Sequence, residues 1–224
     1  MYMKNIFVLI FSLAGLSVVA QTNTEQVAPG AKEQLQALLN NPAMVSPAAV
    51  MPLNRSWYKL ETDAHVITDE AGFEQVAAVL SDLENTAEIF NGKRGRLLAD
   101  IVSHEAGETI VDFVMISIAP MRIQIKTPYR ASVKIVEKIE TKTCIEIKQD
   151  ASDISSNKEI KNLFATRYAE EITIAGKIYT YIRIYSINEV NTSILPGAKG
   201  ILENNSAPSN IEALQLIIAA AKTR

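Results

Sequence analysis

The side chains best suited to chemistry are few and widely separated along this chain. His65 and His104 are its two histidines, and Cys144 is its one cysteine. Neither histidine lies in an HxxxH or HExxH spacing, so a metal site would need further ligands from distant segments. A catalytic thiol needs an activating base, and no histidine is near Cys144 in the sequence. We therefore expect no metal, no cofactor and no catalytic role for these three residues.

Two acids, Asp82 and Glu84, form a pattern that acid–base catalysis could use. Carboxylates that act as an acid and a base must lie together in a cleft, with the pKa of one raised by burial. Asp82 instead follows an apolar helical segment, where its side-chain oxygen can cap the amides of the next turn. We predict capping. The sequence also lacks GxSxG, P-loop and GxGxxG motifs.

Helical spacing predicts that a helix begins after residues 68–70, Thr-Asp-Glu, which offer N-cap chemistry and first-turn acids. Its apolar face consists of residues at i, i+3, i+4 and i+7: Phe73, Val76, Ala77 and Leu80. We expect a second short helix over 83–90, because Asn91-Gly92 tolerates the left-handed conformation that ends helices.

Strands are predicted for most of the middle of the chain. Residues 57–68 form the first, and isoleucine, valine and tyrosine are common in the later ones, as β propensity favours. The later strands are expected at 96–103, 109–118, 121–126, 131–139, 143–148, 163–174 and 177–190. Pro128 should interrupt the strand pattern between residues 126 and 131. Ala175-Gly176 is typical of a tight hairpin turn. The short links between strands indicate antiparallel pairing.

The chain should end in a helix. Ser209 and Glu212 have the spacing of a capping box, and the segment ALQLIIAAAK follows. The polar positions of this helix occupy a narrow arc: Glu212, Gln215, Ala219 and Lys222. A helix that is apolar around most of its circumference is covered on most sides. We expect it to be buried in the fold rather than attached to a membrane surface.

The first twenty residues have the pattern of a secretory signal peptide. Lys4 precedes the apolar run 6–14, and small residues at 18–20 suit cleavage before Gln21. The alternative is an uncleaved anchor, but the run is short against the roughly 20 residues that span a bilayer. We expect a secreted or periplasmic protein with no stable transmembrane span after cleavage.

The remaining chain divides by composition. Residues 21–56 are rich in polar residues and proline, which predicts an N-terminal extension that is partly helical or disordered, followed by a domain at 57–224. The net charge of −3 gives no basic excess, so we expect no nucleic-acid partner. The one cysteine excludes an intramolecular disulfide, so the core must stabilise the fold.

The predicted order of elements resembles the α+β helix-grip fold of the START-like (SRPBCC) superfamily, which includes polyketide cyclase and lipid-transport families. The stretch VAAVLSDLENTAEIFNG looks like the motif of those families in which a helix leads into Asp-Φ-Glu, here Asp82 to Glu84. The family's common Trp is absent, and Ile89-Phe90 takes its place. Leu195-Pro196-Gly197 resembles the entry to the last helix. The resemblance covers roughly 57–222.

The resemblance implies a curved antiparallel sheet of about six or seven strands, wrapped around the C-terminal helix with an apolar cavity between them. Alternation and helical spacing select the candidates to line it: Met121, Ile123, Ile125, Val133, Ile135, Ile145, Ile147, Ile178, Ile182, Ile184, Leu214, Ile217 and Ile218. The same residues could instead fill an ordinary core, because only an empty volume makes a pocket.

The leading hypothesis is an exported, non-catalytic binding protein for a hydrophobic small molecule such as a lipid. One alternative is a cyclase- or hydrolase-like enzyme in the same cavity, for which Asp112, Thr180 and Arg167 are the polar candidates. The other is an envelope interaction protein with a filled core, which binds a partner through residues 21–56.

Overall fold

The computed structural model has two units, Met1–Pro42 and Ala43–Arg224, and the second contains the described residues. These are residues 43–45, 49–54, 56–82, 89, 97–105, 108–118, 124–153, 160–191 and 198–224. The predicted signal peptide and residues 21–42 of the predicted extension lie outside them. So does the predicted short helix 83–90, apart from Ile89, which is helical.

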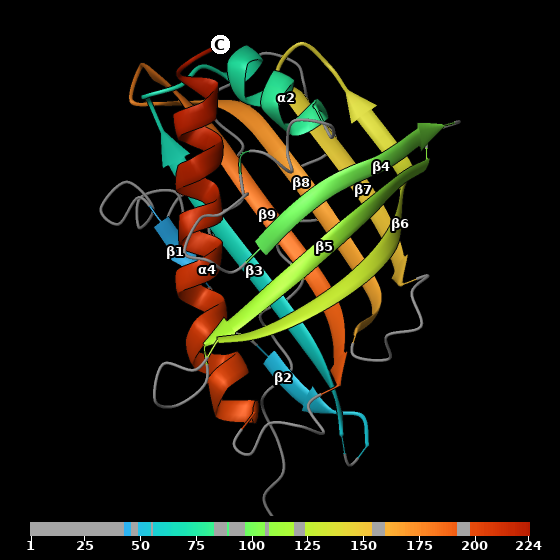
Figure 1. Ribbon diagram of the computed structural model, residues 1–224. Coiled ribbons are helices and arrows are strands. Elements are labelled where there is room, and N and C mark those ends of the chain that lie inside the picture. Colours follow the sequence, from blue (N-terminus) through green and yellow to red (C-terminus); the bar gives the residue numbers. More distant parts are fainter. Residues whose placement is uncertain are drawn as a thin grey trace, which may run out of the picture. The chain divides into compact units, whose positions relative to one another are not determined.

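Seven long strands form one antiparallel sheet (Figure 1). They are β3 (Trp57–Thr68), β4 (Leu97–Glu105), β5 (Glu108–Ile118), β6 (Gln124–Glu140), β7 (Cys144–Asp153), β8 (Ile160–Ile174) and β9 (Lys177–Asn191). Their order in space is β3-β9-β8-β7-β6-β5-β4. Successive strands from β4 to β9 are neighbours, and β9 then pairs with β3. The predicted antiparallel sheet is confirmed.

Two short strands add to the free edge of β3. These are β1 (Ala43–Val45) and β2 (Ala49–Pro52), which pair antiparallel with β3. Part of the segment predicted as an extension therefore belongs to the sheet. Strands of this length between prolines leave no alternation long enough to detect in a sequence.

The predicted break at Pro128 is wrong, because β6 runs continuously through it and Pro128 pairs with Val114 of β5. The described pairing of β6 with β7 begins only at Ala131. Pro128 thus lies where β6 has one described strand neighbour. A missing N–H is tolerated at such an edge position.

Helix α2 (Phe73–Ser81) has the predicted apolar face, and Phe73, Val76 and Leu80 are buried. The predicted cap at 68–70 is wrong. Gly72 precedes the helix, and its N–H donates to Oε1 of Gln75 at 3.0 Å. Thr68 instead accepts a hydrogen bond from the Glu70 N–H at 3.0 Å, which fixes the turn before the helix.

Helix α4 (Ala198–Ala221) begins well before the predicted capping box, so Ser209 is an interior residue. Pro208 also lies inside α4, although proline removes one backbone hydrogen bond. Burial of the helix after the proline compensates, because Leu214, Ile217 and Ala221 are all 3% exposed or less. Tertiary packing thus stabilises the part of α4 that follows Pro208.

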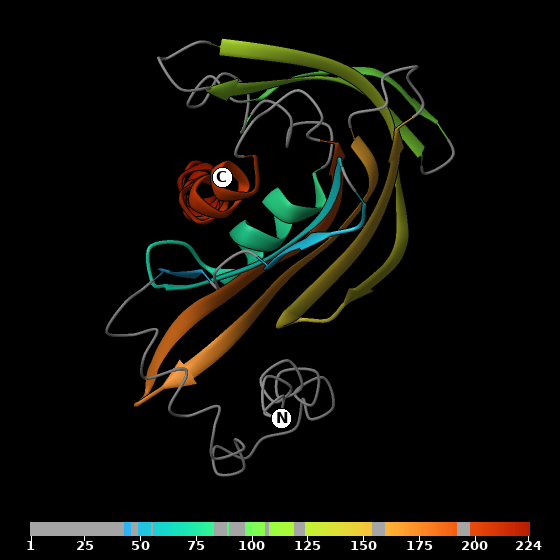
Figure 2. The same ribbon diagram turned by 90° about the horizontal axis from the view of Figure 1, so that it is seen from below.

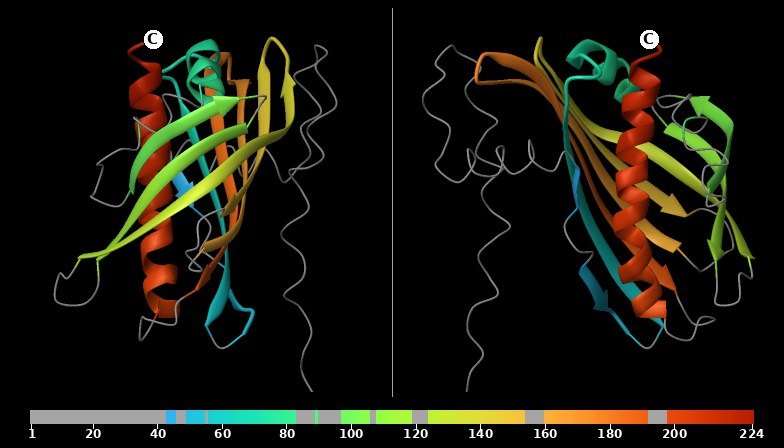
Figure 3. Two further views of the ribbon diagram at one scale, coloured as in Figure 1. Left: turned by 45° about the vertical axis from the view of Figure 1, so that its right-hand side comes forward. Right: turned by 90° about the vertical axis from the view of Figure 1, so that its left-hand side faces the viewer.

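The sheet curves around α4, and both helices lie on its concave face. Figure 2 shows α4 end-on, with β3 and β9 on one side of it and β4 to β6 on the other. Helix α4 packs along β3 and against α2, and α2 covers one end of β7, β8 and β9 (Figure 3). This architecture, a curved antiparallel sheet wrapped around a C-terminal helix, is the predicted helix-grip fold.

The register assigns side chains to the two faces of the central strands. One row across the concave face contains Ala64 of β3, Ile184 of β9, Arg167 of β8 and Ile147 of β7. Ala64 and Ile147 are fully buried in one cluster with residues of α2 and α4, and Ile184 packs against it. Residues one position away along each strand therefore face the convex side.

Candidate functional site

The predicted ligand-contacting residues divide into two groups. Ile145, Ile147, Ile182, Leu214 and Ile217 lie in a single cluster beneath α2, and all are 3% exposed or less. Ile184 and Ile218 are partly buried against this apolar cluster. Phe73, Val76 and Leu80 of α2 fill its centre. This end of the concave face is a packed core.

The other predicted residues lie elsewhere or outside the description. Ile178 is 59% exposed, because the β8–β9 hairpin extends beyond the first residue of β7. Ile135 is 37% exposed, beside an irregularity in the β6–β7 register. Val133 is opposite Ala151 in the same pair of strands. The side chains of Met121, Ile123 and Ile125 lie outside the described residues.

A polar row crosses the concave face next to the apolar cluster. It runs from Thr62 of β3 through Ser186 and Ala165 to Gln149 of β7. Thr62 and Gln149 are each 5% exposed, and the hydroxyls of Thr62 and Ser186 are hydrogen-bonded at 2.8 Å. Sequence reasoning missed this row. The available signal was that Thr62 lies two residues before the apolar Ala64 on the same strand, so the two side chains share one face of the sheet.

Arg167 brings a positive charge to the concave face. The register places it between Ile184 and Ile147, both of which belong to or pack against the apolar cluster. Burial lowers the pKa of its guanidinium to about 10, so Arg167 remains charged at neutral pH.

Asn210 places an amide on the buried side of α4. It precedes Leu214 by four residues and Ile217 by seven, so the three share one helix face. Its Nδ2 is buried and has no hydrogen-bond partner among the described residues. An unsatisfied buried donor costs about 1–3 kcal/mol. Sequence reasoning missed this residue because Asn210 precedes the apolar segment ALQLIIAAAK.

The three polar residues of the enzyme hypothesis lie in different environments. Asp112 is exposed and forms two hydrogen bonds with Arg130, at 2.6 and 2.7 Å. Thr180 is buried, but its hydroxyl donates to the Ala71 carbonyl at 2.9 Å. Arg167 lies on the concave face, opposite Ile184 and Ile147. An arginine keeps its proton at neutral pH, so it cannot act as a general acid or base.

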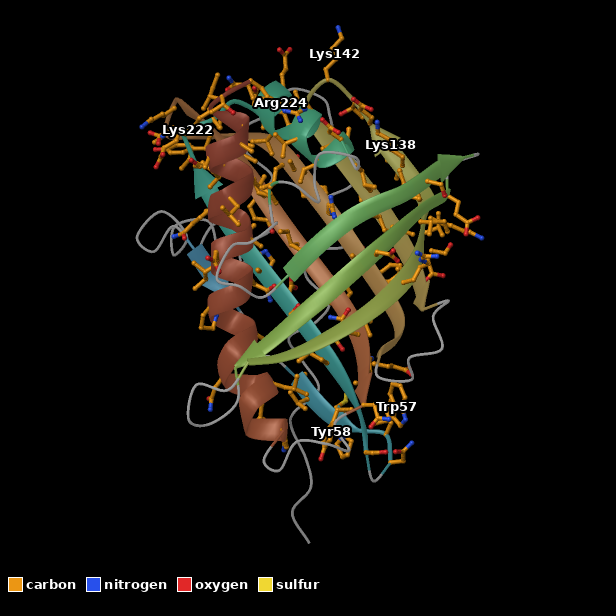
Figure 4. The ribbon with its side chains drawn as sticks, viewed as in Figure 1. Trp57, Tyr58, Lys138, Lys142, Lys222 and Arg224 are labelled. Carbon is orange, nitrogen blue, oxygen red and sulfur yellow. The ribbon has the colours of Figure 1, made fainter. Side chains whose placement is uncertain are left out.

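The carboxylate of Asp82 forms an ion pair with the side chain of Arg224. Asp82 ends α2, and its carboxylate accepts a hydrogen bond from Arg224, which also donates to the Ala78 carbonyl at 3.1 Å. Figure 4 shows Lys222 and Arg224 together at this end of α4, opposite the end of the sheet where Trp57 lies. Glu84 lies outside the described residues. Capping of the next helix by Asp82 therefore stays a prediction.

His65 and Cys144 both lie on the convex face. His65 Nε2 is 3.1 Å from Asp63 Oδ1, and its Nδ1 is 2.6 Å from the Tyr181 hydroxyl. Burial raises the pKa of the Cys144 thiol, which disfavours the reactive thiolate. Within the described part of the chain, no three metal-ligating side chains come together.

Of the helices that the structure describes, none has the length and apolar character needed to cross a membrane.

Comparisons with known proteins give likenesses of fold. No protein-family model matches the chain, and no curated protein matches it. A protein of Thermus thermophilus, TTHA0849, is 13% identical with a TM-score of 0.47, covering 72% of this chain and 96% of its own. The Zhui aromatase/cyclase from Streptomyces sp. R1128 is 13% identical with a TM-score of 0.47, covering 74% and 95%. Human STARD10 is 9% identical with a TM-score of 0.47, covering 89% and 82%.

Proposed function

We propose that this protein is an exported, non-catalytic binding protein that holds a hydrophobic small molecule, such as a lipid, between the concave face and α4. The observation that carries the proposal is the mixed chemistry of this face. Apolar side chains predominate, and a few polar ones lie among them: Thr62, Ser186, Gln149 and Arg167. Ligand sites have this composition, with an apolar lining and a few polar groups that fix orientation.

Desolvation would provide most of the affinity. Apolar surface contributes roughly 25 cal/mol per Å² when it leaves water, so a ligand that buries about 300 Å² gains on the order of 7 kcal/mol. Lost translational and rotational freedom offsets part of this gain. An apolar molecule of lipid size is therefore a suitable ligand, whereas a small polar metabolite would have to rely on the few polar groups.

Binding is favoured over catalysis by the side chains that are present. Among the described side chains of β3, β7, β8 and β9, the concave face has no histidine and no cysteine, since His65 and Cys144 face the other way. Acid–base chemistry needs a group with a pKa near the working pH. Arg167 does not provide one.

The export part of the proposal rests on Lys4, the apolar run 6–14 and the small residues before Gln21. Expression of the full chain in a secreting bacterial host, followed by N-terminal sequencing, tests it. A mature protein that starts at Gln21 outside the cytoplasm is the expected product. A protein that retains Met1 would overturn export.

Extraction of the purified protein with organic solvent, followed by mass spectrometry, tests ligand binding. We expect an apolar molecule in near-stoichiometric amount. Ala165→Phe, on the concave face, should reduce that amount, because the added ring occupies space beside Ser186 and Gln149. Thr166→Phe puts the same ring on the convex face and is the matched control. A ligand-free wild-type protein that binds no added fatty acid or sterol would reject the function.

A further inference from the structure

The last residues of β6 have a described neighbouring strand on one side only. Strand β5 begins at Glu108, which is opposite Lys134, whereas β6 continues beyond this point beside β7. Within the described part of the chain, no strand pairs with the other side of β6 after Lys134. Figure 4 shows Lys138 and Lys142 at the end of the hairpin that β6 and β7 form. Residues 137–141 thus form a free sheet edge, the β6 edge.

The backbone hydrogen bonds of this hairpin show which groups the β6 edge leaves unused. The Thr141 N–H donates to the Cys144 carbonyl at 2.8 Å. Hydrogen-bonded and non-hydrogen-bonded pairs alternate along an antiparallel ladder, so Ile139 also bonds to β7. The N–H and C=O groups of Lys138 and Glu140 therefore point away from β7. Among the described residues, no strand lies beside these groups.

Exposed apolar side chains accompany these backbone groups. Ile139 is 44% exposed and Val136 is 57% exposed. Ile139 is opposite Glu146, on the convex face and away from both helices. Bulges protect many natural edges, but the register irregularity of β6 lies before Glu137, so the β6 edge itself is regular. A regular, exposed edge with apolar side chains is a template on which another strand can pair.

The charges of the β6 edge are self-complementary. Lys138 and Glu140 lie on either side of Ile139 along the strand, and their side chains form an ion pair at 2.7 Å. In an antiparallel pair of two such edges centred on Ile139, each Lys138 is opposite Glu140 of the other copy. A register centred on Lys138 would instead place two lysines opposite each other, which destabilises a ladder. Charge therefore favours the register centred on Ile139.

We propose that a second copy of this chain pairs with the β6 edge, antiparallel and about a two-fold axis at Ile139. The N–H and C=O groups of Lys138 bond to those of Glu140 in the other copy, and the reverse. The two Ile139 side chains face each other as a non-hydrogen-bonded pair, with Cα atoms about 4.5 Å apart. Such a symmetric contact closes after two copies and joins their sheets. This inference does not depend on the proposed ligand.

The dimer should be reversible, because a ladder of this length buries less than the roughly 1,200 Å² of a standard stable interface. Sedimentation equilibrium of the purified protein at about 1 to 500 µM measures it, a range that covers micromolar dissociation constants. We expect the mass to rise from that of one chain toward that of two. A mass that stays that of one chain throughout this range would overturn the proposal.

Charge reversal tests the register. Lys138→Glu and Glu140→Lys each put like charges opposite each other, so each should weaken the dimer about tenfold. An equal mixture of the two variants should associate again, because unlike charges then meet between the two different chains. Lys222→Glu, just after α4, makes the same change in net charge as Lys138→Glu and should leave the dimer unchanged. A dimer that persists in both single variants, or a mixture that does not associate, would overturn the register.

A cysteine at the proposed axis tests the symmetry. Ile139→Cys, made together with Cys144→Ser to remove the native thiol, should form a disulfide-linked dimer under mild oxidation. The expected Cα separation of about 4.5 Å lies within the range of disulfides. Ile178→Cys in the same background is the control, because Ile178 is also exposed but lies on β9. Equal linkage of the two variants would indicate random collision and would overturn the proposed axis.

Discussion

His65 and Tyr181 are joined across β3 and β9 by a hydrogen bond of 2.6 Å between imidazole Nδ1 and the phenol oxygen. The other imidazole nitrogen is 3.1 Å from Asp63, whose carboxylate also accepts two hydrogen bonds of 2.8 Å from Arg183. The convex face therefore has a connected network between its two central strands. This network stabilises the sheet that presents the opposite, concave face to α4.

The first prediction concerns Asp63 and pH. Burial raises the pKa of this carboxyl, but hydrogen bonds from His65 and Arg183 outweigh burial and lower the pKa from 3.8 to about 2. Because the folded pKa is below the unfolded one, the stabilisation is present above pH 4 and is lost as the pH falls toward 2. It amounts to about 2 kcal/mol. Urea unfolding of wild type and Asp63→Asn should show a difference of this order at pH 7 that narrows between pH 4 and 2. A difference that is constant with pH would contradict this assignment.

The second prediction concerns the Tyr181 hydroxyl. Tyr181 is 6% exposed, and burial is the main reason that its pKa is raised. Tyr181→Phe should lower the free energy of unfolding by about 1–2 kcal/mol, because it leaves a nitrogen of His65 unpaired. Tyr185→Phe is the matched control. Its hydroxyl donates to Glu61 at 2.8 Å on a less buried part of the same strand, and its loss should cost less. Equal effects would mean that burial does not strengthen the His65 contact.

The sequence predicts best what depends on neighbours along the chain. The helical spacing of Phe73, Val76 and Leu80 specified α2, and alternation located most strands. The polar row was not predictable in this way, because Thr62 and Ser186 become neighbours only when β3 pairs with β9. Pro128 was misleading for the same reason. Its effect depends on whether a second strand is beside it, which is a property of the sheet and not of the local sequence.

The start of α4 is a further example. Ser209 and Glu212 match a capping box, yet the helix already includes Pro208 and begins at Ala198, and its later residues pack against β3 and α2. Asn210 likewise gave no signal in the sequence, since an asparagine near a helix start is ordinary. Its unpaired Nδ2 becomes informative only when the face of α4 on which it lies is known.

The third prediction concerns Asp82, the acid that could have suggested catalysis. Its partner Arg224 is partly exposed, so Asp82→Asn should reduce stability by no more than about 1 kcal/mol, and about 0.5 M NaCl should diminish the effect. Binding of a fatty-acid probe should be unchanged, because Asp82 pairs with the chain terminus and not with the concave face. Loss of probe binding in a folded Asp82→Asn protein would show that Asp82 contributes to the ligand site.

The fourth prediction separates the packed core from the ligand-contacting surface. Leu214 is fully buried beneath α2, so Leu214→Ala should cost about 2–5 kcal/mol by opening a cavity, whereas Gln215→Ala on the exposed side should change stability by less than about 0.5 kcal/mol.

Ala165→Phe, on the concave face, should behave differently from both. If a ligand occupies the polar row, the added ring displaces it at little cost to the ligand-free protein. If the row is instead packed as tightly as the apolar cluster, overpacking should cost about 1–3 kcal/mol whether or not ligand is present. Thermal unfolding of delipidated and loaded protein distinguishes the two cases, because only a displaced ligand makes the loss of Tm depend on loading.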